Sequence, residues 1–398
     1  MPAPSDVRPV RMTSRAALVL QISSLSAIAA SAGAPTPLYR IYAEHWGLSP
    51  VMVTTVFSVY AISLLVALLT VGGLSDYVGR RPMMFASLIV CALSMAVFAA
   101  ADSVSALLAA RIIQGFGVGI AFGSIGAAIL DTNRSHGSLL NSVTPVTSTG
   151  AGALISGLLV TYAPMPTQLG YLILLAVMLL QAALVGWMPE TAVQRPGAWA
   201  SLRPTVMVPP QARAALLLVS PANIALWALC GFYMSLMPAL LRSVSGSSSL
   251  LLGGVAVAVL TFSGAGAMLA ARPWPGTTIL IRSMSALILG VAITLGGVHA
   301  QSVGLLIGGT VIAGLGFGAG FFGGIRTVVP LALPHQRAGL LSVIFVICYL
   351  AFSLPTIAAG LAVPVLGMTL TLEIYGAAVI VLAAISLIGV LAEIRRAA

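Results

Sequence analysis

Long apolar segments recur along the whole chain and constrain its fold more than any other feature. A helix that crosses a membrane needs roughly 20 consecutive, mainly apolar residues, because the hydrocarbon layer is about 30 Å thick. Read with that window, the sequence predicts an all-α polytopic membrane protein with twelve spans, at about 16–38, 50–71, 83–101, 104–129, 139–163, 168–188, 214–240, 249–271, 277–298, 303–325, 339–363 and 370–392.

The composition excludes a water-soluble protein. Hydrophobic residues make up 59% of the chain and charged residues only 7%. Soluble domains carry about 25% charged residues, so most of this surface must face lipid. The net charge of +10 could suggest nucleic acid, but the arginines recur in alternate loops instead of forming one basic segment. That arrangement is the one that membrane topology requires, and no nucleic-acid partner is expected.

The arginines also predict the orientation, since basic residues are enriched in cytoplasmic loops. One side has only Arg40 and Arg242, and Arg326 is borderline. The side with the excess of arginines is predicted to be the cytoplasm of a bacterial inner membrane, and both termini are predicted to lie there. Its arginines are Arg8, Arg11, Arg15, Arg80, Arg81, Arg134, Arg195, Arg203, Arg213, Arg272, Arg282, Arg337, Arg395 and Arg396.

The first apolar segment has an alternative interpretation. Arg11 and Arg15, the run 16–30 and the small residues at 31–34 are also compatible with a cleavable signal peptide. Cleavage would leave eleven spans and remove the symmetry between the two halves of the chain. We therefore expect the segment to be retained as the first span.

A proline-rich loop and an internal repeat divide the chain into halves. The loop contains four prolines and three arginines and predicts a bundle at 1–190, a cytoplasmic loop at 191–213 and a second bundle at 214–398. The glycine-rich run 115–122 matches 314–321 at a constant offset, so the fourth and tenth spans resemble each other. Two glycine-rich helices alike by composition are the alternative, but the matching position in each half favours a repeat.

The loop at 72–82 carries the most specific motif. It reads G-x-L-x-D-x-x-G-R-R between two apolar runs. This order resembles the signature loop of the major facilitator superfamily, secondary transporters built from two pseudo-symmetric six-helix bundles. The resemblance implies transport by alternating access and a conformational latch in which an aspartate meets the positive end of a helix in the second half. The latch residues that it implies are Gly72, Asp76, Gly79, Arg80, Arg81 and Asp131.

The length of its helix places Asp131 at the same membrane face as the loop at 72–82. It lies about 40 Å along a helix that starts near Ser103 on the outer side, so it reaches the inner face. A simple positive-inside anchor is the alternative function of the loop. It would explain Arg80 and Arg81 but not Asp76 or the glycines.

Arg111 is predicted to lie within the hydrocarbon zone, about 12 Å from the outer end of its helix. A buried guanidinium is costly there unless it faces a wet cavity or a partner. The segment with Arg111, Gln114, Gly115 and Gly117 resembles the fourth-helix motif of the family, which implies that Arg111 and Gln114 take part in proton coupling and that the glycines pack helices. Outward snorkelling of Arg111 is the alternative.

The fifth span is a weaker match. Drug exporters of the family carry G-P-x-x-G-G there, whereas this chain has Gly152-Ala153-Leu154-Ile155-Ser156-Gly157. Gly152 and Gly157 keep a small-residue packing face, but the kinking proline is missing, which weakens the case for antiport. The pattern Pro189-Glu190-Thr191 after the sixth span also resembles drug exporters.

Polar and aromatic residues on inward helix faces are the candidates for a substrate cavity. Each is as consistent with a hydrogen bond between helices as with a cargo contact. Asn223 and Trp227 share a helical face, which makes the seventh span the best candidate. The candidates are Gln21, Ser24, Tyr60, Gln114, Asn141, Thr144, Asn223, Trp227, Tyr233, Thr261 and Tyr349. The cavity residues predicted from them are Gln21, Tyr60, Asn141, Asn223, Trp227, Tyr233 and Tyr349.

No carboxylate is predicted at mid-membrane, although a proton-coupled carrier usually needs a buried acid. Coupling would therefore depend on Glu373, Asp131 or a water at Arg111, or would be absent. A cavity with Arg111 and no acid favours neutral or anionic cargo over cations.

No cofactor or metal site is expected. The three cysteines lie in apolar runs and predict neither a disulfide framework nor a zinc site. Cys230, Met234 and Met237 share one helix face, and soft sulfur ligands suit Cu(I). Fifteen methionines in an apolar chain make adaptable core packing the better account.

Together these features favour a monomeric drug:proton antiporter that exports a small amphipathic compound. The alternatives are uptake of a sugar, amino acid or organic anion by symport or uniport, Cu(I) import, and a receptor or assembly factor on the same scaffold. An enzyme is not expected, because no nucleophile–base pair or metal constellation occurs in the sequence.

Overall fold

The computed structural model describes residues 12–247 and 249–397, and the regular elements in this part are all helical. Ten helices are long and apolar enough to cross a membrane: α1 Ser14–Gly33, α3 Pro50–Val71, α5 Arg80–Ala99, α6 Val104–Thr132, α7 Gly137–Tyr162, α10 Arg213–Ser235, α12 Leu251–Ala270, α13 Gly276–His299, α14 Val303–Val328 and α15 Arg337–Ala397. An apolar helix of 17 residues, α8 Leu169–Val185, is slightly shorter. The all-helical membrane fold predicted from the sequence is confirmed.

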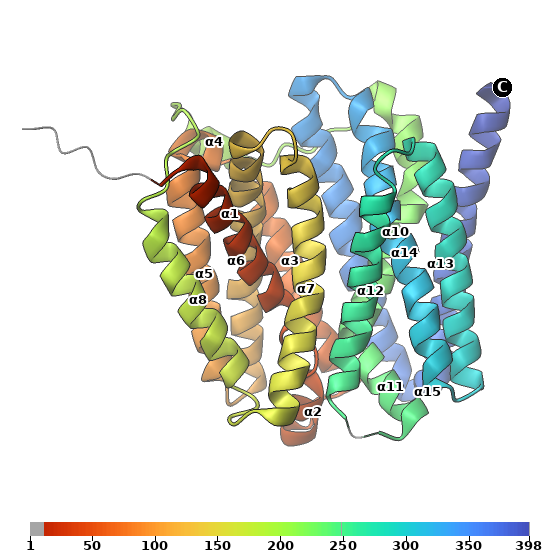
Figure 1. Ribbon diagram of the computed structural model, residues 1–398. Helices are drawn as coiled ribbons and strands as arrows, with labels where there is room; N and C mark the ends of the chain where they lie inside the picture. Colours follow the sequence, from red (N-terminus) through yellow and green to blue (C-terminus); the bar gives the residue numbers. More distant parts are fainter. Residues whose placement is uncertain (1–11, 248, 398) are drawn as a thin grey trace, which may run out of the picture.

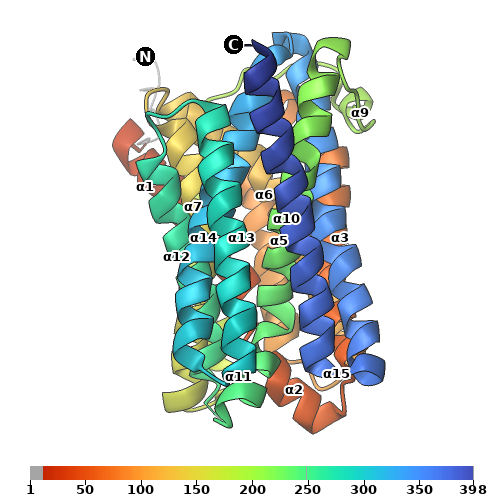
Figure 2. The same ribbon diagram turned by 90° about the vertical axis from the view of Figure 1, so that its right-hand side faces the viewer.

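The last helix consists of two arms. Gly367 has φ of +79° and ψ of 165°, a conformation that ends an α-helix and that glycine adopts without a steric penalty. The arms at 337–366 and 368–397 run in opposite directions (Figures 1 and 2). With α8 and the second arm counted, the helical segments match the twelve predicted spans.

Two predicted spans are wrong in extent. The span predicted at 16–38 ends at Gly33, and a separate short helix, α2 Tyr39–Trp46, follows. Pro35 and Pro37 lie at this break, and they favour it because proline lacks the backbone N–H that a continuous helix would use. The span predicted at 214–240 is likewise divided at Leu236 into α10 and α11 Met237–Ser245.

The remaining elements are short and lie in connections. They are α4 Ser75–Val78, α9 Ala198–Ser201 and three 3₁₀ turns at Pro210–Ala212, Val329–Leu331 and Pro334–Gln336. In Figure 1, α2 and α11 lie at the lower end of the bundle, called here the α2 end. The opposite end, called the α4 end, holds α4, the start of α1 and the C-terminal end of α15.

Glycine contacts show that the two bundles are built alike. A Cβ added to Gly115 would lie closer than 3.0 Å to backbone atoms of α3, and one added to Gly314 would meet backbone atoms of α12 in the same way. Gly117 similarly lies against α5, and Gly316 lies against α13. Equivalent glycines of α6 and α14 therefore pack on equivalent neighbours, as the repeat predicts, and glycine is needed because the backbones approach so closely.

Candidate functional site

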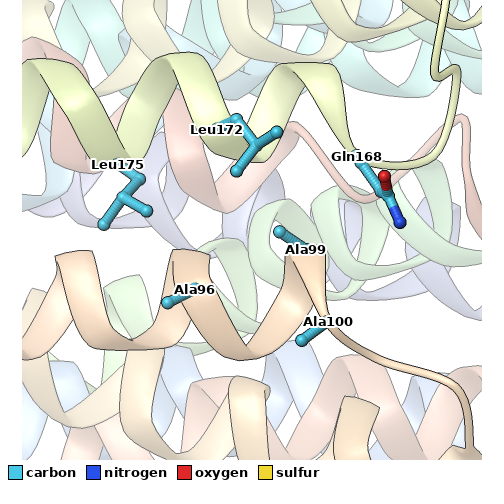
Figure 3. A pocket seen from close by; sticks show the side chains of 6 residues that line it. All are labelled: Ala96, Ala99, Ala100, Gln168, Leu172 and Leu175. Carbon is cyan, nitrogen blue, oxygen red and sulfur yellow. The ribbon is translucent and has the colours of Figure 1, made fainter.

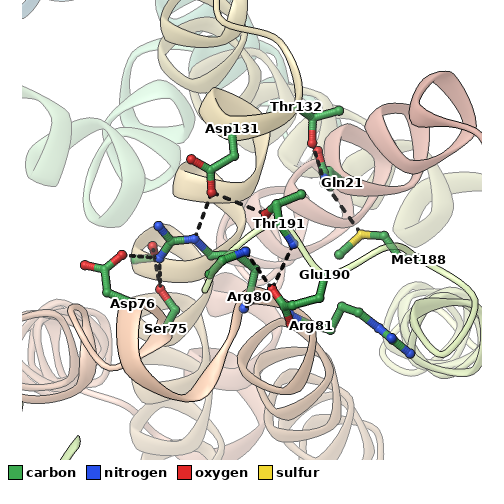
Figure 4. Close-up of polar contacts among 12 residues, drawn as sticks. Gln21, Ser75, Asp76, Arg80, Arg81, Asp131, Thr132, Met188, Glu190 and Thr191 are labelled. Atoms are coloured by element: carbon green, nitrogen blue, oxygen red, sulfur yellow. Dashed lines mark hydrogen bonds and ion pairs between the residues drawn. The ribbon is translucent and has the colours of Figure 1, made fainter. Parts of the chain in front are cut away.

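The charged residues of the 72–82 loop meet at the α4 end around Arg80. The Arg80 guanidinium forms ion pairs with Asp76 of α4 at 2.5 Å and with Asp131 of α6 at 3.1 Å, and it donates a hydrogen bond to Ser75 Oγ at 2.7 Å (Figure 4). The Arg80 side chain is only 11% exposed. One arginine therefore connects α4, the first residue of α5 and the last turn of α6, which are three of the elements that the latch residues were predicted to join.

Glu190, which follows α8, completes this cluster. Its carboxylate accepts hydrogen bonds from the backbone N–H groups of Arg80 at 2.8 Å and of Arg81 at 3.0 Å. These are among the N–H groups that the start of a helix leaves unpaired, and the positive end of the α5 dipole favours a carboxylate there. From the sequence, Glu190 was noted only as part of the segment Pro189-Glu190-Thr191 after the sixth span. The available signal was a carboxylate directly after the last helix of the bundle.

The backbone geometry of the 72–82 loop explains why glycine occurs in it. Gly79 has φ of +113°, which disfavours any side chain, and a Cβ there would lie 2.7 Å from Glu190 Oε2. Gly72 lies so close to Gly123 that a Cβ on Gly123 would overlap the Gly72 backbone. The Arg81 guanidinium donates to the carbonyl of Gly186 at the end of α8. The contacts of Asp76 and Asp131 described here lie within the first bundle, and their role in latching the two halves stays a prediction.

Replacing Arg80 by Gln is expected to destabilise the first bundle. The change leaves two carboxylates without their cation, and we expect the free energy of unfolding to fall by about 1–3 kcal/mol, less than for a fully buried pair because both aspartates are partly exposed. Chemical denaturation of the purified protein measures this. Arg134→Gln, at an exposed position on the next loop, is the control. Equal stability of the two variants would contradict the assignment.

Arg111 is completely buried in the first bundle. Its Nε donates a hydrogen bond to the Tyr39 hydroxyl at 2.8 Å, and its terminal nitrogens donate to the same hydroxyl and to Gln114 Oε1, the latter at 2.7 Å. Gln114 Nε2 in turn donates to the carbonyl oxygen of Ser31 at 2.8 Å. The guanidinium thus points into the bundle and connects α6 with α1 and α2, so the snorkelling arrangement is not adopted.

The surroundings of Arg111 are aromatic and uncharged. Its guanidinium carbon lies 5.2 Å from the ring centre of Tyr60, 5.4 Å from Tyr39, 5.7 Å from Phe98 and 5.9 Å from Phe57. Such distances allow cation–π attraction. Arg111 belongs to none of the five ion pairs formed by the described residues. The positive charge of Arg111 is therefore stabilised by a hydroxyl oxygen, an amide oxygen and aromatic rings, and not by an anionic side chain.

Two predicted cavity residues are engaged between helices. Gln21 is fully buried and donates from Nε2 to Thr132 Oγ1 at 3.0 Å. The Tyr233 hydroxyl lies 2.9 Å from Thr310 Oγ1 and the residue is 2% exposed. Asn141 is half-buried on α7 beside α6. Their part in binding cargo stays a prediction.

The other predicted cavity residues lie near one another. Trp227 of α10 packs edge-on against Tyr349 of α15, with ring centres 5.0 Å apart, and against Phe321 of α14 at 5.5 Å. Phe352 of α15 lies 6.0 Å from Trp227 and 4.7 Å from Phe57 of the first bundle, between ring centres. Asn223, one turn before Trp227, is 2% exposed. Residues of both bundles thus meet around an aromatic group in the middle of the protein.

The packing glycines of α7 serve different neighbours. A Cβ on Gly152 would overlap the backbone of Ala30 in α1, whereas one on Gly157 would make ordinary contacts with Leu251 of α12. Gly152 therefore permits close packing inside the first bundle. Gly157 lies where the first bundle meets the second.

The most prominent surface pocket is not at this interface. It has a volume of about 300 Å³ and lies between α5 and α8, lined by Ala96, Ala99, Ala100, Gln168, Leu172 and Leu175 (Figure 3). Apolar side chains and one amide offer no chemistry for coupling. Cys230 and Met234 lie on α10 and Met237 begins α11, and Cu(I) import stays an untested alternative.

Comparisons with known proteins identify the family. The family model described as Major Facilitator Superfamily matches residues 22–355, most of the chain. The chain belongs to the major facilitator superfamily. It is therefore a multi-pass membrane transporter that moves small molecules by alternating access of two helical bundles, and not an enzyme. No curated protein matches the sequence significantly.

A solved structure of similar fold is a mutant of the nucleoside transporter NupG. It superposes with a TM-score of 0.72 at 15% identity, covering 94% of this chain and 99% of the other. At this identity the similarity shows the fold alone. Because 293 solved chains match significantly, the fold by itself does not select a substrate.

Proposed function

We propose that this transporter exports a small amphipathic compound without net charge across the bacterial inner membrane, in exchange for protons. The observation that carries the proposal is the environment of Arg111. Its buried guanidinium has only uncharged partners, so the core of the first bundle already holds an uncompensated positive charge. A cationic cargo would add to that charge where the dielectric constant is low, whereas a neutral compound avoids the cost.

Proton coupling is assigned to the Arg111–Gln114 group. Arg111 stays charged and Gln114 does not titrate, so neither carries the exchanged proton; the fixed charge of Arg111 instead repels a proton that passes through the cavity and thereby makes passage of the proton sensitive to how Arg111 is buried. Such linkage allows protons and cargo to favour different conformations. The match of this segment to the coupling motif of the family supports the assignment.

The direction of access follows from the contacts between bundles. Near the α2 end, Gly360 of α15 lies so close to Pro50 and Thr54 of α3 that a Cβ there would overlap Thr54. At the same end, Arg242 of α11 pairs with Glu44 of α2 at 2.6 Å. Toward the α4 end, residues 141–147 and 341–347 are half-buried except Thr144 and Ile344. We assign the arginine-rich α4 end to the cytoplasm, so this conformation would load cargo from inside the cell.

Uptake of a neutral solute is the second candidate. The missing proline in 152–157, which weakens the match to the drug exporters, is the observation that supports this candidate. Vesicles that contain the purified protein with its α4 end outward separate the two. With radiolabelled chloramphenicol as a neutral probe, exchange requires accumulation when the lumen is acidic. Accumulation driven by an acidic exterior would establish symport, and equilibration at any gradient would establish uniport.

A test of the charge preference uses the same vesicles. Ethidium serves as a cation and salicylate as an anion of similar aromatic character. The proposal requires that each ion inhibits transport of radiolabelled chloramphenicol less than the same concentration of unlabelled chloramphenicol does. Equal competition by ethidium would contradict the argument from Arg111.

The outer contact between bundles is expected to depend on pH. Glu44 of α2 accepts hydrogen bonds from Arg40 at 3.0 Å and from Arg242 of α11 at 2.6 Å, and these bonds, first that of Arg40, hold the pKa of Glu44 below its usual value. A lowered pKa means that the contact is fully present above the ordinary glutamate pKa of about 4.3 and is lost as the pH falls through the lowered value.

Distance measurements between spin labels at the exposed positions His45 and Ser243 would detect this change. Acidification is expected to increase the population of longer distances between the labels. The increase should be less than about five-fold, because the Glu44–Arg242 pair is solvent-exposed and therefore weak. Glu44→Gln should abolish this pH response. A response that persists in Glu44→Gln would assign the pH dependence to another group.

A further inference from the structure

Two buried polar atoms on adjacent turns of α10 have no hydrogen-bond partner. They are Asn223 Oδ1, an acceptor, and Trp227 Nε1, a donor. Native proteins leave few buried polar atoms unpaired, because such atoms lose their water and gain nothing in return. An unpaired acceptor and an unpaired donor in neighbouring positions therefore indicate a ligand that supplies the complementary pair.

The geometry of α10 brings the two atoms onto one face. Residues four apart on a helix have Cβ atoms about 5–6 Å apart. The indole of Trp227 is held by edge contacts with Tyr349, Phe321 and Phe352, whose ring planes lie at 62–75° to it. These contacts fix the direction of the Trp227 N–H and surround it with aromatic surface, which suits a flat ring.

The side chains of Asn223 and Trp227 form no ion pair with any residue that the structure describes, and the buried charge of Arg111 is bound to other residues. Arg111 is fully buried and engaged with Tyr39 and Gln114. The five ion pairs among the described residues involve neither Asn223 nor Trp227. A cation would be repelled by the buried guanidinium of Arg111, and an anion could pair with it only by breaking the hydrogen bonds to Tyr39 and Gln114, so the chemistry favours a neutral molecule.

We propose that the Asn223–Trp227 face of α10 binds the cargo through a neutral, flat aromatic amide or lactam. Its carbonyl oxygen accepts from Trp227 Nε1, and its N–H donates to Asn223 Oδ1. The aromatic rings of Tyr349 and Phe321 complete the contact. This inference names the substrate class and rests on the proposed transport function, but not on the direction of transport.

The test uses calorimetry on the purified full-length protein with matched probes. 2-Quinolone is a neutral bicyclic lactam with both groups, and N-methyl-2-quinolone lacks the donor. 2-Naphthoate and 2-naphthylmethylammonium are an anion and a cation of similar size. The variants are Trp227→Phe, which keeps the ring but removes the N–H, and Asn223→Leu, which removes the acceptor at similar volume. Trp199→Phe, at an exposed position, is the control.

Binding of 2-quinolone is expected to weaken roughly ten-fold in each site variant and to stay unchanged in the control. N-methyl-2-quinolone should bind more weakly to the unaltered protein, remain sensitive to Trp227→Phe and lose its sensitivity to Asn223→Leu. Both ions should bind at least ten-fold more weakly than 2-quinolone. The comparison of probes on the unaltered protein remains decisive even if a variant fails to fold.

Absence of saturable binding of 2-quinolone below about 1 mM would overturn the inference, as would ions that bind as tightly as the lactam. Chloramphenicol transport is measured in parallel. Transport without lactam binding overturns only the substrate class. Lactam binding that is sensitive to both variants, in vesicles that transport no probe, leaves the binding site standing and overturns the proposed function.

Discussion

Replacing Arg111 by Met is expected to lower transport at least 100-fold while leaving the protein folded. The substitution removes a buried charge that has no carboxylate partner, and replacing such a charge by an apolar side chain is often neutral for stability. Removal of the buried charge offsets part of the cost of leaving Tyr39 and Gln114 without their donor, so we expect the free energy of unfolding to fall by only about 1–3 kcal/mol. The large effect falls on function, because the charge that links cargo and protons is gone.

Vesicle transport and chemical denaturation, measured on the same preparation, separate the two effects. Arg326→Met is the matched control, since Arg326 lies exposed near the end of α14, the counterpart of α6 in the second bundle. Arg111→Lys keeps the charge but cannot bond Tyr39 and Gln114 with one planar group, so we expect intermediate transport. Transport by Arg111→Met above one third of the unaltered rate would remove Arg111 from the coupling mechanism.

The substitution Gly152→Val is expected to destabilise the first bundle more than any other single change proposed above. The added Cβ would overlap the carbonyl and Cα of Ala30, and backbone atoms cannot rotate away as a flexible side chain can. Helix α7 would have to move off α1, at a cost of at least about 1–3 kcal/mol. We expect a lower unfolding temperature and less monodisperse protein after purification.

Gly157→Ala on the same helix is the matched control. Its added methyl group would lie 3.4 Å from the nearest atoms of Leu251, an ordinary van der Waals distance. Alanine also favours helix over glycine by roughly 0.5–1 kcal/mol, so this variant should be at least as stable as the unaltered protein. Similar losses in both variants would mean that glycine serves backbone flexibility in α7 and not close packing.

The sequence predicts the spans well wherever a local rule decides them. The span predicted at 50–71 coincides with α3, since Ser49 caps the helix and Pro50 is favoured in its first turn. The prediction failed at α2 and α11. There the predicted spans continued past the helix ends at Gly33 and Ser235 because residues 34–38 and 236–240 are mainly apolar, although Pro35 and Pro37 offered a local signal.

The site was predictable in part for a similar reason. Asp76 and Arg80 are four residues apart and belong to one motif, so their pairing could be read along the chain. Glu190 is separated from Arg80 by 110 positions, and Tyr39 is separated from Arg111 by 72. No periodicity or spacing connects such residues, because their proximity depends on which helices pack together.

The amino-acid sequence alone determined that this chain crosses a membrane, where most spans lie, which loops carry the basic residues and that its halves repeat. These properties follow from the lipid solvent and from contacts between neighbours in the chain, and both leave local patterns. Tertiary structure alone decided that Glu190 binds the start of α5, that Tyr39 and Gln114 hold Arg111, and that Asn223 and Trp227 keep unpaired atoms. Those outcomes depend on helix packing, which sets the partner of each buried polar atom only when distant segments meet.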